Sequence, residues 1–226
     1  AAINSALGGD YVLVNDLSSE TEGYDDYAGS SANGGAGWLP IGNADKPFTG
    51  SFDGQYHSIS DIYISRNATN LGLFGKTYNK TNHYDTYIKN LKVLNASISE
   101  TGTYPNIGIL GGYLTFNYAG LIENVEVSGT VYAPNSSYVG GFAGIIANAL
   151  TKKCKSNATV TGKSSGEQAG GFVGRVSGCG GGLYIYSGIQ DCYATGSVSG
   201  GSKVGGFSGY NWRTVYYRCY SSTVVS

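Results

Sequence analysis

The sequence has no methionine and is poor in proline, cysteine and histidine, with four, four and two copies among 226 residues. Charged residues make up 13% of the chain, about half the usual share. Strong helix formers are too scarce for a coiled coil or a helical bundle. The 14 basic and 15 acidic residues leave no basic stripe for a nucleic-acid backbone. No apolar run approaches the roughly 18 residues that span a bilayer, so we expect neither a nucleic-acid partner nor membrane insertion.

Glycine and tyrosine are abundant instead, with 37 and 20 copies, and 41% of the residues are hydrophobic. That hydrophobic share excludes a charge-driven disordered chain, and glycine lacks the three-residue period of collagen. The chain opens at Ala1 without an initiator methionine, as a mature product does after removal of a leader. Five Asn-x-Ser/Thr sequons are candidates for glycosylation, at Asn67, Asn79, Asn95, Asn135 and Asn157. We therefore expect a secreted, extracellular glycoprotein of the cell surface.

Two short motifs recur in step along the chain. The first is Gly-apolar-x-Gly, whose five copies begin 36, 33, 30 and 35 residues apart, at Gly72, Gly108, Gly141, Gly171 and Gly206. The second is a tetrad that starts and ends on an apolar residue, at Ile59–Ile62, Ile88–Leu91, Ile122–Val125 and Ile189–Cys192, with weaker copies at Thr151–Cys154 and Tyr216–Cys219. Two motifs that recur together at similar spacing indicate stacked copies of one structural unit.

Each unit has the periodicity of short strands broken by Gly, Asn and Ser turns, which predicts an all-β fold, a single β-solenoid of about six to seven coils. Equivalent residues would stack about 4.8 Å apart. One inward ladder would contain Ile59, Ile88, Ile122 and Ile189, and the Phe of the glycine motif would form another. We expect one domain over residues 1–226, with an N-terminal strand and loop at 1–37 and coils at 38–226. Protruding loops are expected at Glu22–Gly37, Thr77–Thr86, Leu114–Gly120 and Val176–Gly188.

The coil region resembles the GLUG-motif repeat family. The resemblance is carried by Trp38–Gly42, by Pro47–Gly54, by the glycine motifs and by Asp191–Tyr193. It implies a right-handed parallel β-helix of the kind found in large secreted or surface-attached microbial proteins, including adhesins and some immunoglobulin A proteases. The protease chemistry of those proteins lies in separate domains. This chain has no zinc-protease signature, so the resemblance implies no protease role here.

Three of the four cysteines, Cys154, Cys192 and Cys219, end copies of the tetrad and should point into the core. They form either an apolar core ladder or a disulfide between adjacent coils, since the coil spacing suits the Cα separation of a disulfide. Cys179 lies in a Gly-rich loop and could also reach a neighbour. The spacing contains no C-x-x-C, which argues against zinc or thioredoxin-type chemistry.

Carboxylates are the remaining candidates for catalysis or metal binding. Asp61, Glu123 and Asp191 recur at the third tetrad position or beside it, but they alternate there with Asn90, Lys153 and Arg218, which indicates an outward turn ladder. The acidic loop Glu20–Asp26 lacks EF-hand spacing. We therefore predict no enzyme activity, no metal and no cofactor. A β-helix polysaccharide lyase or hydrolase is the third alternative, because it needs two carboxylates on one groove.

The two ends of a solenoid expose unpaired strand edges, which template association unless they are capped. The sequence predicts no helical cap. Candidate assembly strands contain Tyr11, Val12, Leu13 and Val14 at one end, and Val215, Tyr216, Tyr217, Val224 and Val225 at the other. We predict a secreted structural protein that assembles with itself into a homopolymer, as a surface filament or adhesive stalk. The second alternative is a carbohydrate-binding or adhesin module, with glycans or cell-surface molecules as partners, because tyrosines gather in the expected loops.

Overall fold

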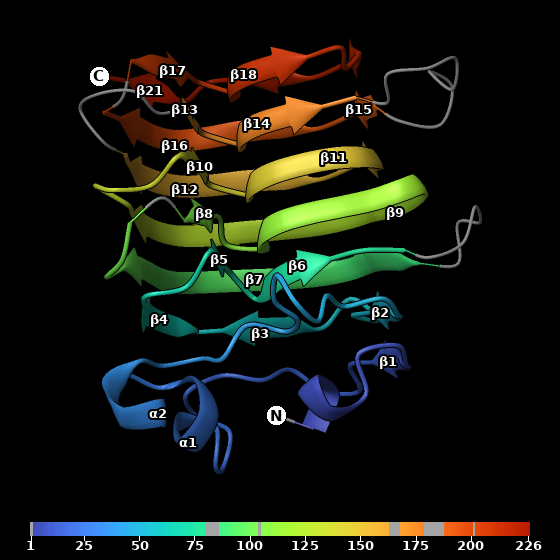
Figure 1. Ribbon diagram of the computed structural model, residues 1–226, viewed down its shortest axis with the longest axis vertical. Helices are drawn as coiled ribbons and strands as arrows, with labels where there is room; N and C mark the ends of the chain where they lie inside the picture. The colour runs from blue at the N-terminus through green and yellow to red at the C-terminus, as the bar shows by residue number, and fades with distance from the viewer. Residues whose placement is uncertain (1, 80–85, 104, 163–167, 179–187, 201) are drawn as a thin grey trace.

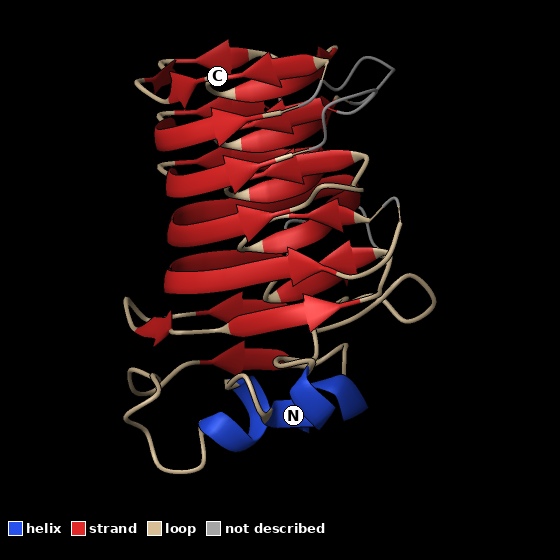
Figure 2. Ribbon diagram, turned by 90° about the vertical axis from the view of Figure 1, so that its left-hand side faces the viewer, coloured by secondary structure: helices blue, strands red, loops and turns tan. Residues whose placement is uncertain are grey.

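The computed structural model describes residues 2–79, 86–103, 105–162, 168–178, 188–200 and 202–226. Its strands pair in parallel between successive coils and stack into an elongated β-solenoid (Figure 1). The expected all-β solenoid is therefore confirmed. Figure 2 shows the coils stacked along one axis, with the few helices gathered at the N-terminal end.

The strands form two sheets. The smaller has five strands, β5 (Asn70–Leu71), β8 (Asn106–Ile107), β10 (Tyr138–Gly140), β13 (Gln168–Gly170) and β17 (Lys203–Gly205). The larger sheet wraps the rest of each coil. Its strands are β1 (Asp10–Val12), β2 (Ser51–Asp53), β3 (Ser58–Ser60), β4 (Tyr63–Arg66), β6 (Phe74–Thr77), β7 (Tyr87–Glu100), β9 (Gly111–Tyr132), β11 (Ala143–Lys152), β12 (Lys155–Thr161), β14 (Val173–Ser177), β15 (Gly188–Gln190), β16 (Tyr193–Ser199), β18 (Ser208–Trp212), β19 (Tyr216–Tyr217), β20 (Tyr220–Ser221) and β21 (Val224–Val225).

The coil number differs slightly from the expected six to seven. The five strands of the smaller sheet mark about four full turns of the chain. Beyond them the coils are incomplete among the described residues: β1 at one end, and β19, β20 and β21 at the other, have no strand of the smaller sheet on their level. The repeat count from the sequence included these partial coils.

The core consists of columns of equivalent residues from successive coils. Ile88, Ile122, Thr151 and Ile189 occupy successive levels and are fully buried. Placing Ile59 in this ladder was wrong, because Ile59 pairs with Val93 in the next column. The cause is a longer corner in the first coil: residues 54–57 lie opposite only residues 90 and 91 of the next coil. Phe52 holds the position that Ile59 was expected to fill.

The glycine motif forms the second ladder, as expected. Phe142 and Phe172 stack with ring centroids 4.5 Å apart, and Phe172 and Phe207 stack at 4.8 Å. A Cβ atom at Gly141 would overlap the carbonyl oxygen of Gly171 on the next coil. Glycine is required here because the backbones of adjacent coils approach too closely for a side chain.

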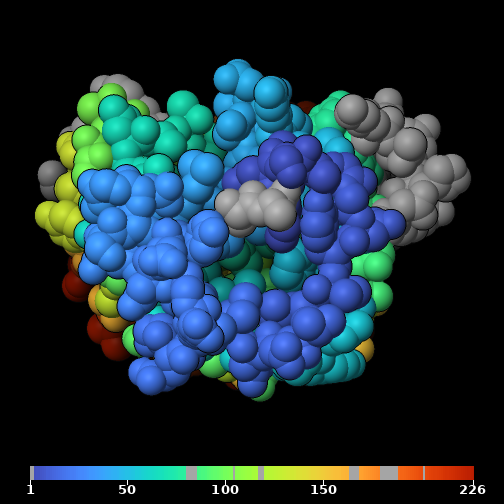
Figure 3. All heavy atoms as spheres, turned by 90° about the horizontal axis from the view of Figure 1, so that it is seen from below, coloured from blue at the N-terminus to red at the C-terminus, as the bar shows by residue number. Residues whose placement is uncertain are grey.

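Two expectations about loops and caps were wrong. Leu114–Gly120 lies within β9, because the strand continues through it and the irregularity is absorbed by a register shift against β11. The N-terminal end carries short helices, the 3-10 helix η1 (Ala2–Ser5), α1 (Asp25–Ala28) and α2 (Ala32–Gly35). Residues of this segment, in blue, cover much of that end (Figure 3). Helices of four residues are too short to produce a helical hydrophobic period, so the sequence pattern did not reveal them.

Candidate functional site

A row of left-handed residues forms one corner of the solenoid. The third tetrad residue has a φ of 50–54° at Asn90, Asn124, Lys153, Asp191 and Arg218. Asparagine and aspartate visit this conformation more readily than other side chains. The Nδ2 group of Asn124 donates to Oδ1 of Asn90 at 3.1 Å, and Asn90 donates to Oδ1 of Asp53 at 3.1 Å. This corner is therefore a hydrogen-bonded column of polar side chains.

A groove of about 250 Å³ follows this corner. One side of it is lined by Asn90, Asn124 and Lys153, and the other by Lys92, Glu126 and Lys155, which occupy successive levels of the next column. Tyr56, from the longer corner of the first coil, lines its N-terminal end and is 70% exposed. The groove therefore crosses four coils along the solenoid axis.

The groove has a positive charge. Three lysines and one glutamate line it. The Nζ atom of Lys155 lies 2.7 Å from Oε2 of Glu126, and this hydrogen bond raises the pKa of Lys155. The Nζ atom of Lys153 lies 3.5 Å from Oε1 of Glu123, and the side chain of Lys153 is 65% exposed. Lys92 is exposed at the same surface.

The three carboxylates considered for catalysis do not meet on this groove. Asp61 lies at a different corner, where its Oδ1 accepts a hydrogen bond from Nδ2 of Asn95 at 2.7 Å. The Nε and Nη2 groups of Arg218 donate hydrogen bonds to the carboxylate of Asp191. The Nζ atom of Lys152 lies 3.2 Å from Oε1 of Glu123. The bond from Asn95 lowers the pKa of Asp61, and Arg218 lowers that of Asp191. Carboxyls held ionised in this way are poorly suited to donate a proton as a general acid.

The cysteine column lies inside the solenoid. Cys154 and Cys192 are buried, Cys219 is half-buried, and all three are free thiols, so a disulfide among them is absent. A hydrogen bond with Cys154 and burial raise the pKa of the Cys192 thiol. A hydrogen bond with Cys192 raises the pKa of the Cys219 thiol. Protonated, buried thiols are inert, which fits packing rather than redox chemistry. Cys179 lies outside the described residues.

The sequons differ in accessibility. Asn67, Asn95, Asn135 and Asn157 are exposed. Asn79 is fully buried, which does not fit an acceptor for a bulky glycan in the folded chain. Modification of the other four stays a prediction. Asn95 of β7 and Asn157 of β12 both neighbour Ser128 of β9, which lies between these strands.

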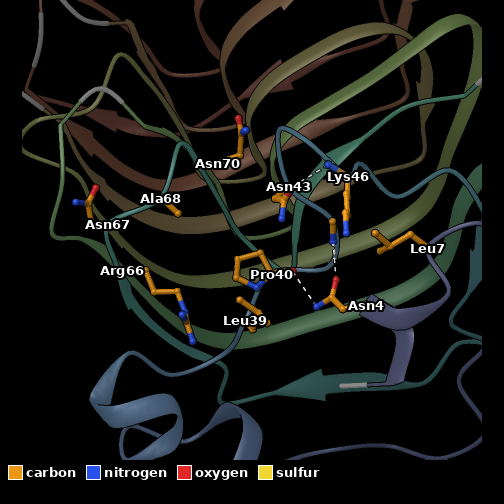
Figure 4. A pocket seen from close by; sticks show the side chains of 11 residues that line it. Asn4, Leu7, Leu39, Pro40, Asn43, Lys46, Arg66, Asn67, Ala68 and Asn70 are labelled. Carbon is orange, nitrogen blue, oxygen red and sulfur yellow. Dashed lines mark hydrogen bonds between the residues drawn. The ribbon is translucent and has the colours of Figure 1, made fainter.

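A second cavity, of about 380 Å³, lies near the N-terminal end (Figure 4). Arg66 contributes there, but its Nε and Nη2 groups donate to the carbonyl oxygens of Trp38 and Gly37. Asn4 donates to Pro40 O at 3.2 Å and accepts from the Gly42 amide at 3.0 Å. Most of the polar groups around this cavity therefore hold the first coils together.

Other residues highlighted by the sequence have structural roles or lie outside the described ranges. The Nδ1 atom of His57 contacts Oδ1 of Asp16 at 3.2 Å, whereas His83 lies outside the described residues. Tyr24 is buried and donates to the Ser60 carbonyl. Within the described ranges no three His, Cys, Asp or Glu side chains gather as metal ligands, and no helix there has the length and apolarity to cross a membrane.

The candidate assembly strands lie at the two ends. Among the described strands, β1 pairs with β2 alone, and β18, β19, β20 and β21 each pair with a single strand. Large apolar side chains are exposed at both ends, namely Val12, Val14, Trp212, Val215, Tyr217, Tyr220, Val224 and Val225. Tyr11, Leu13 and Tyr216 are half-buried. Both ends therefore combine free strand edges with apolar surface.

The ends also carry opposite charge, which the sequence analysis missed. Residues 1–50 contain seven acidic residues and one lysine. Residues 188–226 contain three basic residues, Lys203, Arg213 and Arg218, and one acidic residue, Asp191, which pairs with Arg218. A comparison of charge between segments of the sequence could have revealed this asymmetry, although only the fold places the two segments at opposite ends (Figure 1).

Comparisons with known proteins support the fold. No protein-family profile matches the chain, so membership of the GLUG family stays a prediction. Halomucin of Haloquadratum walsbyi is 36% identical over 142 residues, which cover 62% of this chain and 1% of Halomucin. A crystal structure from Bacteroides ovatus, named as a candidate immunoglobulin A1 protease, matches with a TM-score of 0.63 and 23% identity, covering 97% of this chain and 69% of that one. At this identity the structural match supports the β-solenoid fold alone.

Proposed function

We propose that the chain is a secreted structural protein of a cell surface whose copies associate end to end into a filament or stalk. The observation that carries this proposal is the pair of complementary ends, which combine free parallel strand edges with opposite charge. Similarity to Halomucin supports a surface or secreted location.

The strand register favours continued stacking. One column of the larger sheet runs from Tyr11 through Phe52, Ile88, Ile122, Thr151 and Ile189 to Tyr216. Tyr11 of a second copy would therefore follow Tyr216 of the first in the same column. Repeated contact of this head-to-tail kind does not close and gives a filament.

Charge favours the same orientation. Glu20, Glu22, Asp25 and Asp26 are exposed at the N-terminal end, whereas Lys203 and Arg213 are exposed at the other. Head-to-tail contact brings unlike charges together, and head-to-head contact brings like charges together. Burial of the exposed apolar side chains would add a favourable contribution of about 25 cal/mol for each Å² of apolar surface.

Sedimentation velocity over a range of protein and salt concentrations, with negative-stain electron microscopy, tests the proposal. We expect particles several solenoids long at low ionic strength, and shorter particles as salt screens the attraction between the ends. A single monomeric species at every concentration and ionic strength would contradict it.

A further inference from the structure

We infer that the groove along the left-handed corner binds an acidic saccharide, with Tyr56 as a stacking platform and the lysines as partners of the acid groups. This site lies on the side of the solenoid and does not depend on association of the ends. Three features carry the inference: the exposed ring, the positive charge and the direction of the groove.

Tyr56 has an unusual backbone conformation. Its φ is 68°, and Gln55 before it has a φ of 48°. A bulky residue in this region costs on the order of 1–3 kcal/mol and persists only where the surroundings enforce it. Here the backbone N–H of Tyr56 donates to the backbone carbonyl oxygen of Asn90 at 2.8 Å, and the backbone N–H of Gln55 donates to Oδ1 of Asp53 at 2.9 Å. The turn therefore fixes the backbone that carries the ring, although Tyr56 as a residue is 70% exposed.

The ring is suited to a sugar. The apolar face of a pyranose can pack on an exposed tyrosine, while the tyrosine hydroxyl stays in water. Beside it, the corner presents the side-chain amides of Asn90 and Asn124, which have donors and acceptors of the kind that pair with sugar hydroxyls. An aromatic face next to amide groups favours a saccharide over a simple anion.

The lysines select an acidic ligand. Lys92, Lys153 and Lys155 line a groove whose only lining carboxylate is that of Glu126. Glu126 already pairs with Lys155, and Glu123 beside the groove is shared by Lys152 and Lys153. Two glutamates therefore face four lysines here, and the exposed Lys92 and the largely exposed Lys153 can contact a carboxylate or sulfate group of the ligand. A neutral saccharide would leave this charge without a counterpart.

The groove crosses the coils at right angles to the strands. Tyr56, Asn90, Asn124 and Lys153 belong to four successive coils. Three coil spacings of about 4.8 Å give a length of about 14 Å. An extended oligosaccharide of a few units, rather than a single sugar, fits that length.

Isothermal titration calorimetry with a short oligogalacturonate tests the inference. Tyr56→Ala and Lys92→Gln should each weaken binding about tenfold. Tyr27→Ala, which removes a 57% exposed tyrosine on α1, and Lys46→Gln near the second cavity are matched controls that should leave affinity unchanged. Circular dichroism should confirm that all four variants are folded.

A neutral galactan oligosaccharide and a poly-glutamate peptide complete the test. The inference predicts weak binding of both. Equal affinity for the neutral saccharide would overturn the assignment of an acidic ligand, and equal affinity for poly-glutamate would overturn the assignment of a saccharide. Absence of oligogalacturonate binding, or equal loss in the control variants, would overturn the site itself.

Discussion

Replacing Phe172 by alanine tests whether the stacked side chains hold the coils together. Phe172 is fully buried between Phe142 and Phe207, whose ring centroids lie 4.5 and 4.8 Å away. Loss of a buried phenylalanine costs about 3–5 kcal/mol because a cavity replaces the ring. We expect Phe172→Ala to lower the free energy of unfolding by about 4 kcal/mol.

A matched control separates burial from ring stacking. Tyr193 and Tyr220 stack with centroids 5.1 Å apart and an interplanar angle of 6°, but Tyr220 is 59% exposed. Tyr220→Ala also breaks a stacked pair of rings but removes little buried surface. We therefore expect the free energy of unfolding to fall by about 1 kcal/mol or less.

Urea unfolding followed by tryptophan fluorescence measures both variants. Trp212 lies on β18, which pairs with the strand that follows Phe172, whereas Trp38 lies in the first coils. Because each coil contacts only its neighbours, the Trp212 signal should shift more than the Trp38 signal. Equal losses for Phe172→Ala and Tyr220→Ala would refute the claim that the buried column dominates.

Two further predictions concern the corners. Asn124→Ala should destabilise the fold by about 1–2 kcal/mol, because alanine loses the bond to Asn90 and disfavours a φ of 54°; Asn124→Gly, which relieves the backbone cost, should lose less in the same urea assay. The bond from Asn95 lowers the pKa of Asp61 below 3.8 in the folded chain, so its stabilisation is present above that value and is lost as the pH falls through the lowered pKa. Asp61→Asn should therefore flatten the acid side of the stability–pH curve, and an unchanged acid side would count against this role.

The sequence predicted the columns whose residues keep the same spacing in each coil. Ile88, Ile122 and Ile189 stack as expected because the column of Val93, Val127 and Ala194 follows five positions later in each of their coils. The same logic failed for Ile59, since two additional residues at the Gly54–His57 corner shift its register. Repeat spacing alone does not reveal on which side of a corner an insertion lies.

The candidate sites were harder to predict. The groove joins Tyr56 to Lys92 and Lys153, which come from different coils and share no local motif. The charges of the two terminal segments can be counted in the sequence. That they lie at opposite ends of the solenoid, where they can attract a second copy, follows only from the fold. The N-terminal helices cover part of that end and leave β1 as its edge strand. The surface available for association is therefore smaller than expected from the sequence.

Mixing two charge-reversed variants tests end-to-end association most directly. One variant carries Lys203→Glu and Arg213→Glu, so both of its ends are acidic; the other carries Glu20→Lys, Glu22→Lys, Asp25→Lys and Asp26→Lys at its N-terminal end. Each variant alone should stay monomeric in sedimentation velocity, since like charges would meet at every contact. An equal mixture should form filaments of alternating copies, because unlike charges then face each other at every junction. A mixture that stays monomeric, or variants that assemble alone as well as the wild type, would contradict the account.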